Sequence, residues 1–267
     1  MSSIVVDDRT GAPLSAMPNE GADTASEHSH IPPAYGRNNP AVLRVALVYM
    51  LTGFVIFLAM GLLGLVMRLD HAGWWVIPAD WFYRIMTLHG AGMVASLLMA
   101  AIGGMIAALN RTVNLSVRWL WTAYVVYSLS VPFLLYAVLI GGFAGGWTAL
   151  DPLPFNGLTW SKSAGVLMYL TFLSVGVGFA IYCLHVFLSL RRKAGGIRKA
   201  LGWDVLFSRG PAKEDRYEPT VVELAAMSTG IIGLATAVCG LVVLIPLFAE
   251  AAGLGAHGNP RYSKNLI

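Results

Sequence analysis

The sequence contains five long apolar stretches, and no other feature restricts its fold as strongly. They cover roughly residues 45–67, 85–109, 119–142, 164–190 and 223–249. A bilayer core about 30 Å thick is crossed by about 20 apolar residues of helix, so each stretch is long enough to span it. Backbone polar groups in lipid must be hydrogen-bonded internally, and the stretches lack the alternating pattern of barrel strands. The sequence therefore predicts an all-α, polytopic membrane bundle of five transmembrane helices.

The composition agrees with this fold class. Of the 267 residues, 57% are apolar and 12% are charged, which is far outside the range of soluble globular domains. Residues 1–40 are instead polar and rich in Ser, Pro, Ala and Gly, without the apolar core of a cleaved signal peptide. We expect a disordered tail there, with His28 and His30 exposed to solvent and not bound to metal. The predicted domains are this tail, the bundle at 41–250 and a C-terminal tail at 251–267.

Basic residues near the ends of the spans predict the orientation of the protein. The loop between the fourth and fifth stretches contains Arg191, Arg192, Lys193, Arg198, Lys199, Arg209, Lys213 and Arg216. Because Lys and Arg are retained on the cytoplasmic side, we expect this loop and the N-terminus inside and the C-terminal tail outside. The predicted location is the cell inner (cytoplasmic) membrane, crossed several times. The net charge of +4 then reflects topology and does not indicate a nucleic-acid partner.

The second apolar stretch carries a histidine into the membrane. His89 lies near the start of YRIMTLHGAGMVASLLMAAIGG, residues 83–104. An ionisable side chain inside a transmembrane helix is costly and is by default a functional hypothesis, although a neutral histidine can also hydrogen-bond a neighbouring helix. Gly90 and Gly92 lack side chains, so a large flat group could approach the backbone beside His89. Both interpretations stay open on these residues, and the glycines favour a cofactor ligand.

The depth of the histidines decides whether two of them could bind the same iron. His89 is about five residues from Arg84, which places it about 7 to 8 Å below the outer boundary. His185 is about six residues from Arg191 at the inner end, so the two imidazoles are separated in depth by well over 10 Å. They cannot share a metal. If His89 binds haem iron, the opposite ligand comes from another polypeptide or the iron is five-coordinate.

Four segments, in order along the chain, are similar to one family. YRIMTLHGAGMVASLLMAAIGGM resembles the second transmembrane helix of the catalytic subunit of haem-copper oxygen reductases, where a Thr-x-His-Gly sequence supplies an axial ligand of the low-spin haem. GLLGLVMRLDHA (61–72) is similar to the end of that family's first helix, and Arg68 matches an arginine at the haem periphery. GGWTALDPLP (145–154) is similar to the segment before helix four, and Trp147 matches a tryptophan beside a haem propionate. GNPRYSKNLI resembles the stretch that leads into helix six.

The resemblance implies a haem site on this chain. His89 would be the metal ligand, and Arg68, Trp147 and Gly90 would lie in the cofactor-binding pocket, with no catalytic residue of their own. The topology places Arg68, His89 and Trp147 at one depth near the outer face, where an arginine and an indole N–H can hydrogen-bond polar haem substituents. The family's other haem ligand, its copper ligands and its cross-linked tyrosine belong to later helices, which the sequence does not contain.

The four similar segments, together with the family's later helices that the sequence does not contain, predict the function. We expect the N-terminal fragment of a split haem-copper terminal oxidase subunit I, holding part of the pocket of a low-spin haem of b or a type. A second multi-helix membrane subunit would carry the remaining haem and copper ligands, so copper would be bound only there. Cytochrome c or another outer donor would supply electrons, and the chain alone would be inactive. The alternative is a non-catalytic membrane anchor or a haem-b electron conduit for another respiratory oxidoreductase.

Several smaller features have structural interpretations. Cys183 and Cys239 have no partner at metal-ligand spacing and are expected to pack, and the glycine pairs 103/104 and 176/178 are expected at close helix contacts. Glu223 lies at a boundary of the fifth stretch, so no buried carboxylate relay is expected. Residues 197–207 (IRKALGWDVLF) are either a short amphipathic helix at the inner headgroups or a solvated basic connector. Packing is the expected role of Tyr124, Tyr127, Tyr136, Tyr169 and Tyr182.

Overall fold

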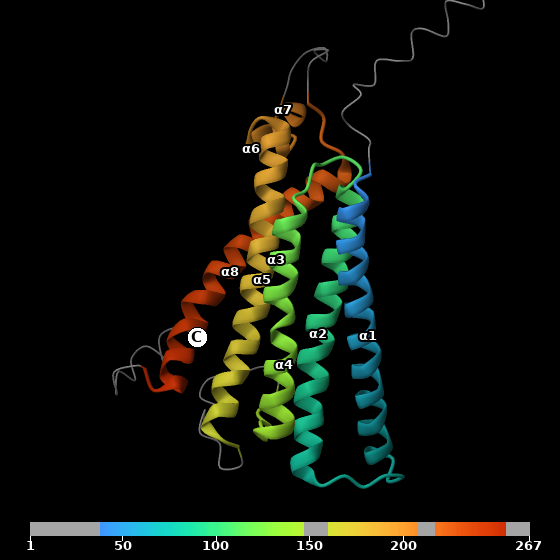
Figure 1. The fold of residues 1–267 in the computed structure, drawn as a ribbon, viewed down its shortest axis with the longest axis vertical. Helices are drawn as coiled ribbons and strands as arrows, with labels where there is room; N and C mark the ends of the chain where they lie inside the picture. The colour runs from blue at the N-terminus through green and yellow to red at the C-terminus, as the bar shows by residue number, and fades with distance from the viewer. Residues whose placement is uncertain (1–37, 147–159, 208–216, 255–267) are drawn as a thin grey trace, which may run out of the picture. The chain divides into compact units, whose positions relative to one another are not determined.

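The computed structural model describes residues 38–146, 160–207 and 217–254, and within these ranges every regular element is a helix. The elements are α1 (Pro40–His71), α2 (Ala79–Leu109), α3 (Val117–Ser128), α4 (Ser130–Leu135), η2 (Tyr136–Ile140), α5 (Lys162–Ala194), α6 (Ile197–Ala200), α7 (Trp203–Leu206) and α8 (Val221–Ala252) (Figure 1). Trp147, His257 and nearly all of both predicted tails lie outside the described residues.

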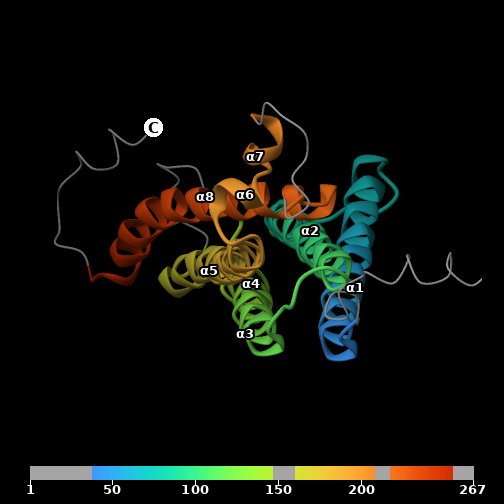
Figure 2. The same cartoon turned by 90° about the horizontal axis from the view of Figure 1, so that it is seen from above.

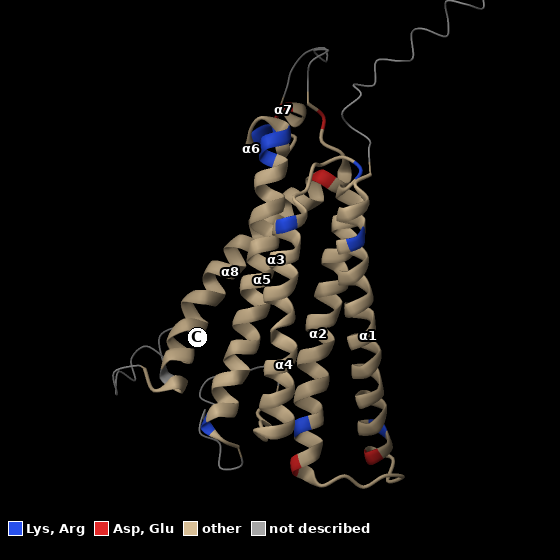
Figure 3. Cartoon of the chain, viewed as in Figure 1, with Lys and Arg blue, Asp and Glu red and all other residues tan. Residues whose placement is uncertain are grey.

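Five membrane-length helices confirm the predicted fold class. The spans are Pro40–His71, Ala79–Leu109, Val117–Ile140, Lys162–Ala194 and Val221–Ala249. Charged residues of the described chain gather towards the two ends of the long helices, whose middle sections carry none (Figure 3). Because an ionised side chain can reach the headgroups from a helix end, the helices extend beyond the apolar stretches that predicted them. The orientation across the membrane stays a prediction.

Local sequence explains where the first helix begins and how it is fixed to the second. Asn39 caps α1 because its side-chain oxygen accepts a hydrogen bond from the backbone N–H of Ala41, and Pro40 needs no donor at this position. Asn110, directly after α2, accepts from the N–H of Asn39 at 3.2 Å and donates to its carbonyl at 3.1 Å. This reciprocal pair ties the start of α1 to the end of α2.

Close backbone contacts hold the helices together. A Cβ placed on Gly53 of α1 would lie 2.8 Å from the carbonyl oxygen of Ser96 on α2, and one on Gly178 of α5 would lie 2.7 Å from the backbone nitrogen of Tyr127 on α3. Seen from above, α1 lies beside α2, while α5 packs against α3 and α8 (Figure 2). Interfaces of small residues are how membrane helices approach closely without a hydrophobic driving force between them.

The predicted close helix contact is confirmed for one glycine of each pair and is wrong for the other. Gly103 lies at a close contact, since a Cβ there would be 2.8 Å from the carbonyl oxygen of Ala46, and Gly178 does too. A Cβ on Gly104 or Gly176 would meet nothing within 4 Å. One glycine of each pair therefore serves an interface and the other does not.

This difference gives a matched test. Gly178→Ala should lower the unfolding free energy by about 1–3 kcal/mol, because the added methyl group would clash with the Tyr127 backbone, which cannot rotate away. Gly176→Ala, two residues away on the same helix, should leave stability unchanged or raise it slightly. Thermal unfolding of both variants in one detergent compares them. Equal midpoints would contradict the close α3–α5 contact.

The tyrosines and cysteines are mostly in the core. Tyr127 is buried and its hydroxyl donates to the carbonyl of Ala95 at 2.8 Å, joining α3 to α2, and Tyr182 is also buried. Cys183 is fully buried as predicted, whereas Cys239 is exposed on α8. Tyr136 is exposed too, so packing within this chain is wrong for Cys239 and Tyr136. Both lie on faces that membrane lipid can cover.

Candidate functional site

His89 is half-buried in the first third of α2 and faces α1. Its Nδ1 lies 2.7 Å from the carbonyl oxygen of Met60 on α1. Gly64, one turn further along α1, provides the space for the ring, because a Cβ at that position would lie 2.8 Å from His89 Cε1. The imidazole is therefore fixed in position by the backbone of another helix.

The hydrogen bond also defines the chemical state of the ring. A backbone carbonyl can only accept, so Nδ1 must carry the proton. In the neutral imidazole, Nε2 then holds a lone pair. None of the hydrogen bonds among the described residues uses Nε2 of His89. A histidine whose Nδ1–H donates to a backbone carbonyl while Nε2 stays available has the arrangement of metal-ligating histidines.

Thr87 connects this part of α2 to the segment before Trp147. It is fully buried, its hydroxyl donates to the carbonyl of Tyr83 at 2.8 Å, and the same oxygen accepts from the N–H of Gly146 at 3.0 Å. The last described residue before Trp147 thus lies against α2 two residues from His89. Thr87 belongs to the Thr-x-His-Gly pattern, but this contact with Gly146 was not predicted from the sequence.

Two arginines lie near this end of the bundle. Arg68 is exposed in the last turn of α1, one turn beyond Gly64, and forms no ion pair with a described carboxylate. Arg84 pairs with Asp80 at 3.5 Å, but its buried Nε has no hydrogen-bond partner in the described chain. An anionic group bound here would find two guanidinium groups with unused donors. From sequence alone, Arg84 marks only the membrane boundary.

His185 has a different role from His89. Its Nε2 accepts a hydrogen bond from the N–H of Ser116 at 3.0 Å, directly before α3, and its ring is parallel to that of Trp119 with centroids 6.4 Å apart. Ser116 follows the C-terminal end of α2, whereas His89 is near the N-terminal end. The two histidines are therefore well separated, as their predicted depths require. The Nε2 lone pair of His185 is therefore occupied by a hydrogen bond within the bundle, unlike that of His89.

The remaining candidates do not add a second ligand. His71 is exposed, with Nδ1 2.9 Å from the Met67 carbonyl of its own helix. The described residues contain no group of three or more His, Cys, Asp or Glu side chains that could hold a metal ion. Within that part of the chain, His89 is the residue best placed to contribute a single ligand.

An apolar cavity of about 270 Å³ lies next to the site. Met60, Leu88 and Gly92 line it at the His89 end, and Leu134 and Phe172 line it on the opposite helices. Its hydroxyl-bearing residues include Ser96 and Thr171, whose side chains donate to carbonyls of their own helices. The cavity therefore presents few free polar groups, as expected of a cavity that holds no water.

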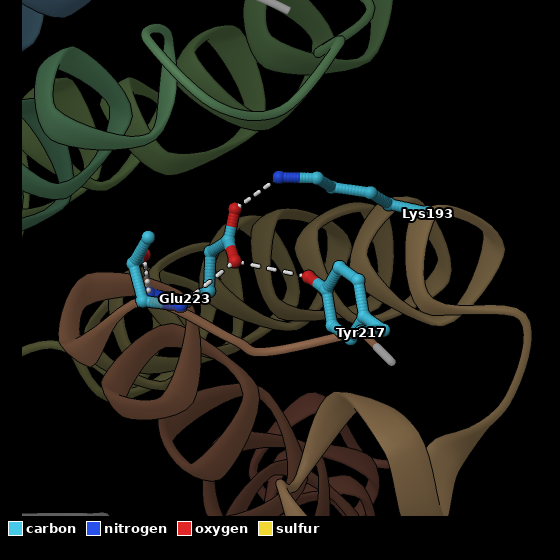
Figure 4. A network of polar contacts seen from close by, with 4 residues as sticks. Lys193, Tyr217 and Glu223 are labelled. Atoms are coloured by element: carbon cyan, nitrogen blue, oxygen red, sulfur yellow. Dashed lines mark hydrogen bonds and ion pairs between the residues drawn. The ribbon is translucent and has the colours of Figure 1, made fainter. Parts of the chain in front are cut away.

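A buried ion pair at the other end of the bundle was not predicted. Glu223, at the start of α8, is only 1% exposed and binds Lys193 of α5 and the Tyr217 hydroxyl (Figure 4). Its Oε2 also accepts from the N–H of Thr220, whose hydroxyl accepts from the N–H of Glu223. The helix-boundary position was correct, but the burial was not anticipated. The sequence TVVE before an apolar run is a capping-box signature that indicates this local pattern.

The fold and the site together define a class of protein. The described residues form an all-helical bundle with five spans and a histidine in the second span whose Nδ1 lies against the backbone of the first, which is the architecture of a multi-pass membrane protein. Residues 44–262 match the family described as Cytochrome C and Quinol oxidase polypeptide I. The chain therefore belongs to this family, as its four sequence segments had indicated. No curated protein and no solved structure matches it.

Membership of this family indicates the general function of the chain. The chain is a haem-copper oxidase subunit I-like protein of the membrane electron-transport machinery. Members of this family work in multi-subunit oxidase complexes that receive electrons from cytochrome c or a quinol.

Proposed function

We propose that this chain is the N-terminal part of a split subunit I and that Nε2 of His89 is one axial ligand of a low-spin haem of b or a type. The observation that carries this proposal is the hydrogen bond from Nδ1 of His89 to the carbonyl of Met60. It leaves Nε2 with its lone pair and no described hydrogen-bond partner. Bound haem would supply one-electron transfer, and the residues of the chain hold and tune it.

Each neighbouring residue has a physical role in the proposed pocket. The Met60 carbonyl fixes the imidazole tautomer and makes the ring a stronger donor to a metal. Gly64 leaves space for the ring, and the apolar helices keep water away from it. Arg68 is the proposed partner of an anionic haem substituent, and the unused Nε of Arg84 is a second donor at this end. Trp147 and Gly90 complete the proposed pocket.

The opposite side of the haem is the part that needs a partner. Nε2 of His185 accepts a hydrogen bond from the N–H of Ser116 far along the bundle, and His71 is exposed at the end of α1. We propose that a second multi-helix subunit provides the opposite axial ligand, together with the high-spin haem and copper ligands. In the inner membrane, electrons from cytochrome c or another outer donor would reach the haem held between the two chains.

Gly64 provides a test that leaves every proposed ligand in place. Gly64→Ala should push the His89 ring off the Met60 carbonyl, because the new Cβ would lie 2.8 Å from Cε1. Losing such an orienting bond costs about 10- to 100-fold in metal affinity, so the haem content of the purified complex should fall. Gly61→Ala is the matched control, since a Cβ there meets nothing within 4 Å.

The readout is the ratio of haem to protein together with the reduced-minus-oxidised absorption spectrum. Full low-spin haem content and an unchanged spectrum in Gly64→Ala would mean that the ring beside Gly64 does not hold the cofactor.

A further inference from the structure

Residues 195–207 follow α5 at the Arg-rich end of the bundle and contain the short helices α6 and α7. α5 ends at Ala194 and is followed by Gly195, which has φ +71°, and the N–H groups of Gly195 and Gly196 bond back to the carbonyls of Arg192 and Arg191. This is the paired pattern that closes many helices. Ala200 in α6 is buried against the bundle, so the turn is fixed in place. We call residues 195–207 the α6–α7 segment.

The tip of this segment exposes large apolar side chains. Leu206 is 73% and Phe207 is 71% exposed, and Trp203 and Val205 are exposed as well. Figure 2 shows that α7 lies to the side of the bundle, beyond α6 and α8. The α7 part of the chain therefore extends beyond the outline of the long helices in this view, and it carries exposed apolar side chains.

Four cations lie in the last turn of α5 and in α6, before the apolar tip in the sequence. Arg191, Arg192, Arg198 and Lys199 are exposed, and none forms an ion pair with a described carboxylate. Figure 3 shows these positions gathered at the end of α5 and in α6. Lys193 differs from them because it pairs with Glu223 inside the bundle. Asp204 is the segment's one acidic residue.

We propose that the α6–α7 segment is a binding site for anionic phospholipids at the membrane surface. Its apolar side chains enter the boundary between headgroups and acyl chains, and its guanidinium and ammonium groups bind lipid phosphates. Exposed aromatic and aliphatic groups beside unpaired cations are the combination that interfacial segments use. The positive-inside prediction assigns this surface to the cytoplasmic leaflet. Of the two interpretations open from the sequence, the exposure favours the membrane-bound one.

A spin label at position 207 tests the proposal in the full-length protein with its copurifying subunits. Phe207→Cys is labelled in a Cys239→Ser background, because Cys183 is fully buried and does not compete. The complex is placed in nanodiscs of phosphatidylcholine, with or without phosphatidylglycerol. With phosphatidylglycerol, the label should be reached more readily by dissolved oxygen than by a polar nickel chelate. A label at exposed Glu218→Cys should show the opposite preference.

The charge requirement is tested in the same discs. Each cation removed by Arg198→Ala or Lys199→Ala should lower the partitioning of the segment about fivefold, so the double variant should move the label into water. Arg44→Ala also removes one positive charge, from an exposed position on α1, and should leave the label in the membrane. Glycerol phosphate in solution should not compete, since the site is a lipid surface. The proposal would be overturned if the label is exposed to water in both lipid mixtures, or if its accessibility to oxygen and to the nickel chelate is the same with and without the two substitutions.

Discussion

Replacing His89 with alanine is expected to remove the low-spin haem from the complex. The substitution deletes Nε2, the proposed iron ligand, and leaves an apolar cavity that cannot bind the metal. No other described histidine can take its place, because His185 and His71 make contacts elsewhere. The low-spin bands of the reduced-minus-oxidised spectrum should be lost completely, and extracted haem should fall by the corresponding share.

His185→Ala is the control for this experiment, since it removes an imidazole from the same bundle. It should cost about 1–3 kcal/mol of stability, because the N–H of Ser116 loses its acceptor. The low-spin haem should remain. Circular dichroism of both variants would show whether the helices have formed. A folded His89→Ala complex with its full low-spin spectrum would exclude His89 as the ligand.

The largest loss of stability is expected for Glu223→Ala. Glu223 is 1% exposed and Lys193 is 15% exposed, and the substitution removes the carboxylate that both the Lys193 ammonium and the Tyr217 hydroxyl contact. Breaking a buried pair by removing one partner costs about 3–5 kcal/mol. The contact between α5 and α8 should loosen, and the thermal unfolding midpoint of the detergent-solubilised protein should fall.

Two further variants separate the ion pair from a general charge effect. Glu218→Ala removes an exposed carboxylate five residues earlier in the chain and should change stability by less than about 0.5 kcal/mol. Lys193→Met combined with Glu223→Leu replaces both charges with apolar groups and should recover most of the loss. If Glu223→Ala unfolds at the same temperature as Glu218→Ala, the pair does not stabilise the helix contact.

The sequence predicts the spans well because hydropathy measures directly what a bilayer requires. The predicted spans 45–67 and 223–249 lie within α1 and α8. Each helix extends a few residues beyond its predicted span, and caps such as Asn39 set where α1 begins. His89 also stood out from sequence alone, because an imidazole within an apolar helix needs a reason. These features depend on local composition and not on how the helices pack.

Features that depend on the register between helices could not be predicted. The contact between His89 and Met60 joins residues 29 positions apart, and its partner atom is a carbonyl that no side-chain pattern reveals. Gly103 and Gly104 look equivalent in sequence, yet only Gly103 faces another backbone. The burial of Glu223 follows from where Lys193 lies on α5. Each case needs the rotation of one helix against another.

A density map of the complex purified from its native membrane tests the central proposal most directly. We expect porphyrin beside α2, with its iron bonded to Nε2 of His89, Nδ1 still on the Met60 carbonyl, and the opposite ligand supplied by a separate polypeptide. A His89 ring packed only against ordinary side chains, with no porphyrin next to it, would contradict it.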